Sequence, residues 1–180
     1  MKMRNEIGAI VLLTFFSALI GCTAKKAQNF NFIDGFSEGS ISPNEVNGSP
    51  TGKPAFVMNG FLVGGENRRA LVVMASGKIV FDIGEVGNQT KLKFSVGMNA
   101  TMGDGAEGVI TVEAAGTSEV VYRRFLNPID RPDDRKWFDE AVDLSKFAGK
   151  GVKISFETKP GPKGDATGDW FAWANLQLIA

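Results

Sequence analysis

The sequence predicts an all-β protein, an antiparallel β-sandwich of jelly-roll type. Short runs of alternating apolar and polar residues recur along the chain, and turn residues separate them at hairpin-length intervals. After the first 21 residues, no stretch keeps an apolar period of 3.6 for three helical turns. Eight or nine such strands in roughly 150 residues can form two packed sheets around one core.

The strands follow a loop-rich entry segment. Residues 36–54 are dense in Gly, Ser, Pro and Asn, which predicts a long loop or an irregular first strand. Alternation is clearest in 91–98, where large apolar residues take one face and lysine and serine take the other. In chain order, we expect strands over 55–63, 69–74, 77–83, 91–98, 107–115, 118–126, 152–158 and 169–179.

The stretch 137–149 predicts a corner between two strands. Asp143 can accept backbone N–H groups of the short turn after it, and Gly149 lets the chain reverse. Trp137 stands among several carboxylates here, so the stretch is either an active site or a scaffold. Because these carboxylates alternate along a strand and largely face solvent, we interpret Trp137 as a scaffold anchor.

The N-terminus predicts an exported protein with a lipid anchor. A basic start precedes an apolar run, 7–20, that is shorter than the about 20 residues needed to span a bilayer. The tetrapeptide LIGC at 19–22 resembles the lipobox of bacterial lipoproteins. This resemblance implies that the signal is cleaved, that the thiol of Cys22 is acylated, and that several acyl chains give a stable anchor. Thr23, in place of an aspartate, favours the outer membrane.

The chain therefore divides into a signal peptide, 1–21, an acylated cysteine with a tether, 22–28, and a single β-sandwich domain, 29–180. The full sequence has 20 basic and 20 acidic residues, and removal of the signal leaves a net charge of about −1. Such a balance gives no electrostatic reason to expect nucleic acid. The expected partners are the lipid bilayer, through Cys22, and a glycan or an envelope protein.

The residue types exclude much enzyme chemistry. The chain has no histidine and one cysteine, which excludes Ser-His-Asp and Cys-His catalysis and zinc sites built from these residues. Carboxylate chemistry is left, but Asp133 and Asp134 lie among arginines and prolines, as in a solvated loop. A glycosidase using Asp139 or Asp169 is a third hypothesis. We expect a protein that is not an enzyme.

Acidic loops flanked by glycine are candidate calcium sites, because calcium prefers carboxylate and carbonyl oxygens. Their acidic residues include Asp34, Asp104, Asp165 and Asp169. None of the loops has the spacing of an EF-hand, and Asp-Gly is also a strong turn dipeptide. We interpret these loops as turns and expect no cofactor, with structural calcium as the alternative.

The C-terminal half resembles galactose-binding-domain-like jelly rolls, a group that includes carbohydrate-binding modules. The resemblance rests on Trp137, on the DLS and FAG segments at 143–145 and 147–149, and on Asp169 with Trp173 in the last strand. It covers about residues 90–180 well and 29–89 loosely. It implies the same sandwich, with ligands held by variable loops at one end.

These observations favour a membrane-anchored, non-catalytic envelope lipoprotein whose β-sandwich binds a carbohydrate or another envelope ligand. Sugar sites combine an exposed aromatic ring with a few polar groups. The candidate rings are Phe36, Phe61, Trp137 and Trp173, and core packing is the alternative for each. The alternative function is a structural or assembly lipoprotein whose sandwich edge or loop face docks a protein partner.

Overall fold

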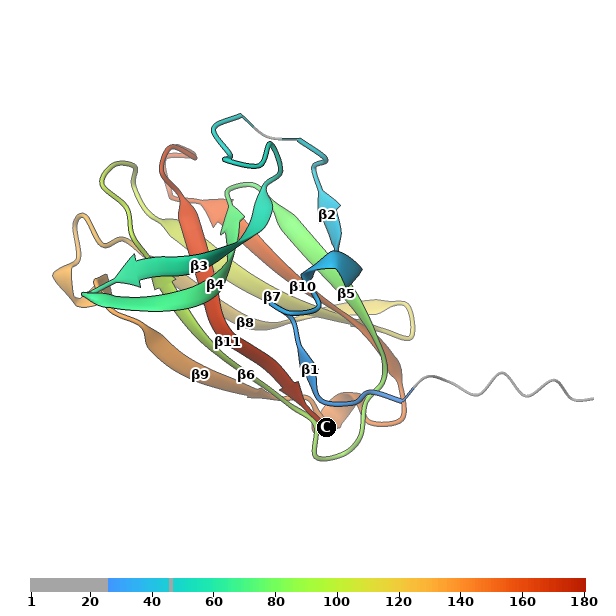
Figure 1. Ribbon diagram of the computed structural model, residues 1–180. Helices are drawn as coiled ribbons and strands as arrows, with labels where there is room; N and C mark the ends of the chain where they lie inside the picture. The colour runs from blue at the N-terminus through green and yellow to red at the C-terminus, as the bar shows by residue number, and fades with distance from the viewer. Residues whose placement is uncertain (1–25, 46) are drawn as a thin grey trace, which may run out of the picture.

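The computed structural model describes residues 26–45 and 47–180, which form two packed antiparallel sheets (Figure 1). The predicted signal peptide and Cys22 lie outside the described residues. One sheet has the order β3-β4-β11-β6-β9 with β1 beside β11, and the other has the order β2-β5-β10-β7-β8. This arrangement confirms the predicted antiparallel sandwich. No helix in the described part of the chain is long and apolar enough to cross a membrane.

We call the first sheet the arm sheet and the second the back sheet. The arm sheet contains β1 (Phe30–Asn31), β3 (Ala55–Val63), β4 (Glu66–Met74), β6 (Lys91–Met98), β9 (Phe138–Asp143) and β11 (Trp170–Ile179). The back sheet contains β2 (Ser40–Ser42), β5 (Lys78–Glu85), β7 (Ala106–Ala114), β8 (Thr117–Leu126) and β10 (Gly151–Pro160). Short 3-10 helices span Phe36–Glu38, Pro132–Asp134 and Ser145–Phe147.

The core between the sheets follows from the period-two alternation of the strands. On β11, Phe171 and Trp173 point into the sandwich and are fully buried, whereas Trp170 points to the opposite face. Trp173 packs against Phe94 and Phe156, with ring centroids 5.7 and 5.4 Å away. Burial of large apolar side chains contributes about 1.5–3 kcal/mol each, so this cluster is a main source of stability.

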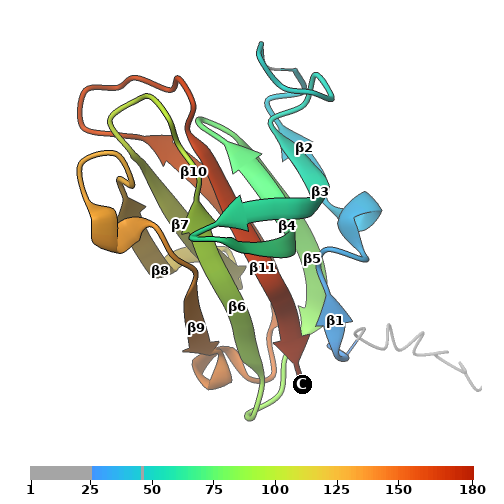
Figure 2. The same ribbon diagram turned by 60° about the vertical axis from the view of Figure 1, so that its left-hand side comes forward.

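The arm sheet also buries residues on its outer face, because β3 and β4 fold over it. The pairing of β4 with β11 stops at Ala70, and β3 carries a bulge between Met58 and Phe61. Beyond these points the two strands continue as a hairpin across β11 and β6 (Figures 1 and 2). We call this hairpin, residues 59–69, the arm.

The connections between strands gather at two ends of the sandwich. Connections 43–54, 99–105 and 161–169 share one end, and 86–90 and 144–150 share the other (Figures 1 and 2).

The predicted corner lies at the second of these ends. Asp143 Oδ1 accepts the Ser145 N–H at 2.8 Å, and Gly149 has a φ of 74°. The expected hydrogen bond from the main chain of this turn to Asp143 is therefore confirmed, although Leu144 and not Asp143 is the N-cap residue of the 3-10 helix.

Candidate ligand-binding face

The arm ends in a tight turn that rests on a neighbouring connection. Gly64 and Gly65 form the turn, with φ values of 60° and 87°, as required for a two-residue hairpin loop of type I′. A Cβ on Gly64 would collide with the carbonyl oxygen of Arg135 and lie 3.3 Å from Lys136 Cα. The arm is therefore held at its tip by the connection between β8 and β9.

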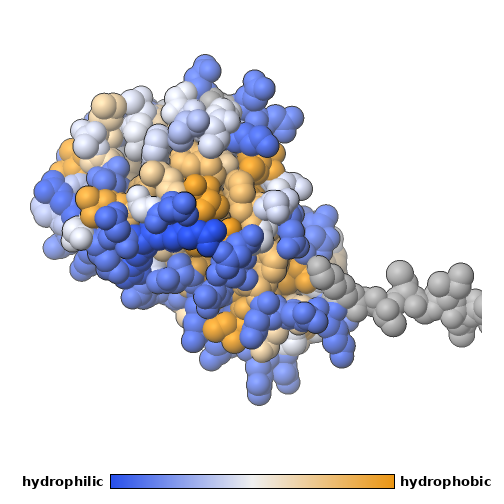
Figure 3. Space-filling view, viewed as in Figure 1, coloured by the Kyte–Doolittle hydropathy of each residue, from blue (hydrophilic) through white to orange (hydrophobic). Residues whose placement is uncertain are grey.

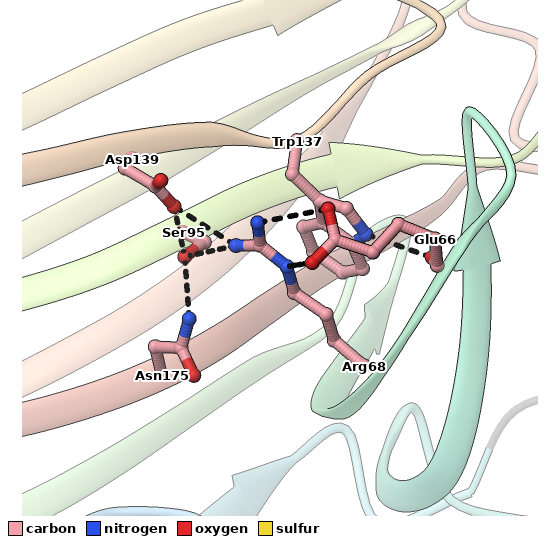
Figure 4. A network of polar contacts seen from close by, with 6 residues as sticks. All are labelled: Glu66, Arg68, Ser95, Trp137, Asp139 and Asn175. Carbon is pink, nitrogen blue, oxygen red and sulfur yellow. Dashed lines mark hydrogen bonds and ion pairs between the residues drawn. The ribbon is translucent and has the colours of Figure 1, made fainter.

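Arg68 joins the arm to the sheet below it (Figure 4). Its Nε and Nη2 donate to Glu66 at 2.7 and 3.0 Å, and its Nη1 donates to Ser95 Oγ at 2.7 Å and to Asp139 Oδ1 at 2.8 Å. Ser95 donates to Asp139 Oδ1 at 2.6 Å and accepts from Asn175 Nδ2 at 3.1 Å. These five residues, which we call the arm network, connect β4, β6, β9 and β11.

Trp137 supports the arm from below (Figure 4). Its Nε1 donates to the Glu66 carbonyl oxygen at 3.1 Å, and the Arg68 guanidinium lies 5.1 Å from the centre of its ring. Phe61 meets the ring edge-on at 6.2 Å. A Cβ on Gly97 would lie 2.9 Å from a Trp137 ring atom, so only glycine at position 97 leaves room for the indole. Trp137 is 9% exposed and acts as an anchor.

The arm network keeps its carboxylates ionised and open to solvent. The hydrogen bond from Arg68 lowers the pKa of Glu66, and the hydrogen bond from Ser95, followed by that from Arg68, lowers the pKa of Asp139. The Glu66 and Asp139 side chains are 59% and 74% exposed. Asn175 is exposed as well, because a bulge in β11 gives it a φ of 50°. Carboxylate and amide groups in this arrangement suit the hydroxyl groups of a polar ligand.

A cleft of about 450 Å³ opens at the end of the same face, where β11 begins. Trp170 and Met74 line it together with segments 47–48 and 166–168 from two connections. Trp170 is half-buried and stands edge-on to Phe56, with ring centroids 5.6 Å apart. In Figure 3, hydrophobic residues gather on this face beside the hydrophilic arm. A partly open indole with polar neighbours is typical of a small-ligand site.

Two buried carboxylates lie next to this cleft. Asp169, directly before Trp170, has no exposed surface, and Asp104 is 7% exposed. Asp104 Oδ2 accepts the Lys163 backbone N–H at 2.5 Å, whereas Asp104 Oδ1 and both Asp169 carboxylate oxygens have no hydrogen-bond partner among the described residues. Burial raises the pKa of Asp169 to about 7, and the negative charge of Asp104 contributes to this rise. The Gly161 N–H lies nearby and lowers the pKa in part, but its geometry is not that of a hydrogen bond.

The structure encloses most of the aromatic residues expected to contact a ligand. Trp173 is 0% exposed between the sheets, and Phe61 and Trp137 are 5% and 9% exposed under the arm. Phe36, in the first 3-10 helix, is half-buried against the core. The first three pack in the interior and offer no open ring face in this structure, and a ligand-binding role for any of the four stays a prediction.

The acidic residues considered as calcium ligands fall in two places. Asp104 and Asp169 come together, and Asp165, in the same connection as Asp169, accepts the Thr167 N–H at 2.9 Å. Asp34 instead forms an ion pair with Arg69. Within residues 26–45 and 47–180, no group of three or more Asp, Glu, His or Cys side chains converges. A metal at Asp104 and Asp169 would therefore need main-chain oxygens as further ligands.

Sequence reasoning did not single out Trp170 or Arg68. The spacing of Trp170 and Trp173 could have indicated Trp170. Side chains three residues apart on a strand point to opposite faces of the sheet, so these two tryptophans cannot both enter the core between the sheets. For Arg68 the sequence carries no comparable signal, since its partners Ser95 and Asp139 are 27 and 71 positions away.

The fold defines the class of the protein as a β-sandwich of the kind found in carbohydrate-binding modules. TmCBM61, in complex with β-1,4-galactotriose, superimposes with a TM-score of 0.54 and 13% identity, over 82% of this chain and 92% of that one. The xylan-binding CBM22-1 domain of Xyn10C from Paenibacillus barcinonensis superimposes with a TM-score of 0.53 and 14% identity, over 87% of this chain and 97% of that one. A cleaved adhesin domain of Lys-gingipain from Porphyromonas gingivalis superimposes with a TM-score of 0.52 and 9% identity, over 80% of this chain and 93% of that one. These likenesses establish the fold.

In sequence, no family model matches the chain. A curated relative, an uncharacterized protein of Archaeoglobus fulgidus, is 34% identical over 105 residues. The match covers 56% of this chain and 26% of the relative, so the chain spans about a quarter of that protein's length.

Proposed function

We propose that this protein is a non-catalytic, glycan-binding lipoprotein, anchored in the cell envelope through an acylated Cys22. Its sandwich has the fold of a module in complex with β-1,4-galactotriose and of a xylan-binding domain. Its sequence has no histidine and a single cysteine, Cys22, whose thiol this proposal assigns to acylation. The apolar N-terminal run and the LIGC tetrapeptide support the anchor, and Thr23 supports an outer-membrane destination.

The observation that carries the glycan proposal is the Trp170 cleft. Its volume of about 450 Å³ falls within the usual range for ligand pockets. The half-open indole offers an apolar face for the C–H groups of a sugar ring. The amide of Asn47 and the hydroxyl of Thr167, both on exposed residues lining the cleft, can bind sugar hydroxyls.

A glycan array with the detergent-solubilised full-length chain tests this proposal. The array should include β-1,4-galactan and xylan oligosaccharides. We expect selective binding that Trp170→Ala weakens at least about tenfold, which corresponds to about 1.4 kcal/mol of binding free energy. Phe30→Ala is the matched control, since it removes another half-buried ring, one that lies beside Leu178 near the opposite end of β11. Equal affinity of Trp170→Ala and the wild type would place the glycan elsewhere.

The aromatic residues named from the sequence are tested in the same assay. Trp173→Phe and Trp137→Phe should lower the melting temperature and leave glycan affinity unchanged, because both rings are enclosed. A loss of affinity without a loss of stability would instead restore them as ligand-binding residues. A blank array, together with co-purification of a stoichiometric envelope protein, would favour the alternative of a docking lipoprotein.

The anchor is tested by metabolic labelling with a palmitate analogue and by membrane fractionation. We expect label in the wild type and none in Cys22→Ala, which should leave the membrane fraction. Label retained by Cys22→Ala would contradict the anchor. Absence of catalysis is tested by turnover of chromogenic glycosides, and turnover that Asp139→Asn or Asp169→Asn abolishes would contradict it.

A further inference from the structure

A second cleft, of about 490 Å³, lies at the tip of the arm. Three segments that are distant in sequence surround it: Val63 and Gly64 of the arm tip, residues 98–101 at the end of β6, and the connection between β8 and β9. Among the described residues, it shares no lining position with the Trp170 cleft. We call it the arm-tip cleft and treat it as a separate place on the molecule.

The base of the arm-tip cleft is aliphatic. Val63, Met98 and Pro128 are buried there, and Ile129 is half-buried beside them. No aromatic side chain lines this cleft within the described chain. A sugar site normally offers an aromatic face, whereas aliphatic side chains pack well against one another. The base therefore suits an aliphatic side chain of a ligand better than a sugar ring.

Arg135 gives the arm-tip cleft a fixed positive charge. Its Nε donates to the Pro128 carbonyl oxygen at 2.6 Å and its Nη2 to the Ile129 carbonyl oxygen at 3.2 Å. These bonds hold the guanidinium in place and use two of its five N–H donors. Arg135 forms no ion pair within residues 26–45 and 47–180. An oriented guanidinium with free donors and an unbalanced charge is suited to bind a carboxylate.

Neighbouring charged groups of the same connection have other partners. Asp134 Oδ2 accepts the Asn127 main-chain N–H at 2.8 Å, and Asp130 Oδ2 accepts from Asn127 Nδ2 at 2.9 Å. Lys136 Nζ lies 5.2 Å from the centre of the Phe138 ring. No carboxylate lines the arm-tip cleft in the part of the chain that the structure describes. The cleft is therefore positively charged and selects against a cationic ligand.

The rim of the cleft adds polar groups that carry no charge. Asn99 and Thr101 line it, and both residues are exposed. Their amide and hydroxyl groups can donate to and accept from peptide groups. A single guanidinium, an aliphatic base and a neutral polar rim match three features of a peptide C-terminus: its carboxylate, its last side chain and the peptide groups before it.

We infer that the arm-tip cleft binds the C-terminal carboxylate of a partner peptide that ends in an aliphatic residue. The carboxylate pairs with Arg135, the last side chain enters the aliphatic base, and the preceding peptide groups bond to Asn99 and Thr101. This site is independent of the proposed glycan function, because the Trp170 cleft has other lining residues.

The test uses an array of tetrapeptides with three glycines and a variable last residue, immobilised through their N-termini. Each of the twenty C-terminal residues is offered as the free acid and as the amide to the detergent-solubilised full-length chain. We expect the strongest binding to acids that end in Leu, Ile, Val or Met. Amidation should weaken this binding at least about tenfold, which corresponds to about 1.4 kcal/mol. Equal binding of acids and amides, or no binding to either, would overturn the site.

Variants locate the peptide. Arg135→Gln should abolish the preference for acids over amides. Arg131→Gln is the matched control, because Arg131 is an exposed arginine of the same connection that lies over the Phe125 ring outside the cleft, and it should bind like the wild type.

A second variant leaves the guanidinium in place, since Arg135→Gln also removes two hydrogen bonds to the main chain. Ile129→Phe keeps both acceptor carbonyl groups and narrows the base of the cleft. It should shift the preference from peptides that end in Leu to peptides that end in Ala. A preference for Leu that neither substitution changes would place the peptide elsewhere.

An acidic sugar is the competing ligand with the same charge. Galacturonic acid in large excess should not displace the peptide, and displacement that Arg135→Gln abolishes would overturn the peptide in favour of an acidic glycan. Trp170→Ala should leave peptide binding unchanged. A blank glycan array beside a positive peptide array would refute the glycan function and leave the arm-tip site intact.

Discussion

Arg68 determines how the arm lies on the sheet, and its chemistry cannot be supplied by another residue type. The planar guanidinium reaches Glu66 with two nitrogens and Ser95 and Asp139 with the third, while its face lies over Trp137. A lysine ammonium has no planar fork and cannot make both sets of contacts at once. The position of the arm therefore depends on the shape of the arginine side chain as well as on its charge.

We expect Arg68→Lys to lower the free energy of unfolding by about 1 kcal/mol, a value reduced for the exposure of both carboxylates. Urea unfolding measures the change. Arg69→Lys is the control, because the Arg69 side chain is 48% exposed and, within residues 26–45 and 47–180, forms an ion pair with Asp34 alone. This substitution should change the free energy of unfolding by less than about 0.5 kcal/mol. Equal effects of the two substitutions would mean that the arm network contributes nothing specific.

The lowered pKa of Asp139 makes part of this stability depend on pH. A carboxyl group with a lower pKa in the folded state stabilises the fold above its unfolded pKa, about 3.9, and loses this effect as pH falls through the folded value. The melting temperature of the wild type should therefore exceed that of Asp139→Asn at pH 6, and the difference should shrink as pH falls below about 4. A difference that is constant down to pH 2 would contradict this assignment.

The arm consists of the parts of β3 and β4 that no longer pair with β11 and instead cover the outer face of the arm sheet. Only the part of β4 next to β11 belongs to the flat ladder, and the bulge in β3 lets both strands turn across the outer face. Their apolar residues then cover that face, with Phe61 and Val63 close to Trp137 and Gly97. The two glycines at the tip allow the turn, but they differ in their surroundings.

This difference gives a prediction about the arm tip. Gly65→Ala should lower the free energy of unfolding by about 1–2 kcal/mol, because alanine disfavours the positive φ at this position. No steric clash should add to this loss, since the space around a Cβ on Gly65 is open. Gly64→Ala should cost clearly more, since its Cβ would also strike the main chain at Arg135. Urea unfolding compares the two variants. Similar losses would show that the tip does not rest on the connection between β8 and β9.

At the scale of the whole molecule, the sequence was sufficient for most of the fold. Strands β3 to β8, β10 and β11 overlap the strands predicted from the sequence, because apolar residues recur along each of them between turn residues. The pairs of β1 with β11 and of β2 with β5 were not predictable, since segments this short carry no period. The arm network was not predictable either, because it depends on a bulge at Asn175 and on contacts distant in sequence.

The two ends of β11 separate the candidate site from the predicted anchor. Trp170 begins the strand, and Leu178, near its far end, pairs with Phe30 of β1. Ten residues of β-strand extend about 30 Å, so the two ends of β11 lie far apart.

The first described residues, Lys26 and Ala27, contact Glu85 at the end of β5 that adjoins connection 86–90. Four residue steps from Cys22 to Lys26 span at most about 14 Å. On the proposed anchoring, the 86–90 end faces the bilayer and the Trp170 cleft faces away from it.

This orientation can be measured with single labels, because acylation of Cys22 leaves the protein without another thiol. Asn88→Cys places a fluorophore in connection 86–90, and Asn44→Cys places one in connection 43–54 at the opposite end; both positions are exposed. In vesicles that contain spin-labelled lipid, the label at position 88 should be quenched strongly and the label at 44 weakly. Vesicles in which the spin-labelled lipid is replaced by the same lipid without a spin label provide the unquenched control for each position. Stronger quenching at position 44 would mean that the cleft faces the membrane, and a lipid headgroup or a membrane-bound partner would then replace an external glycan as the ligand to test.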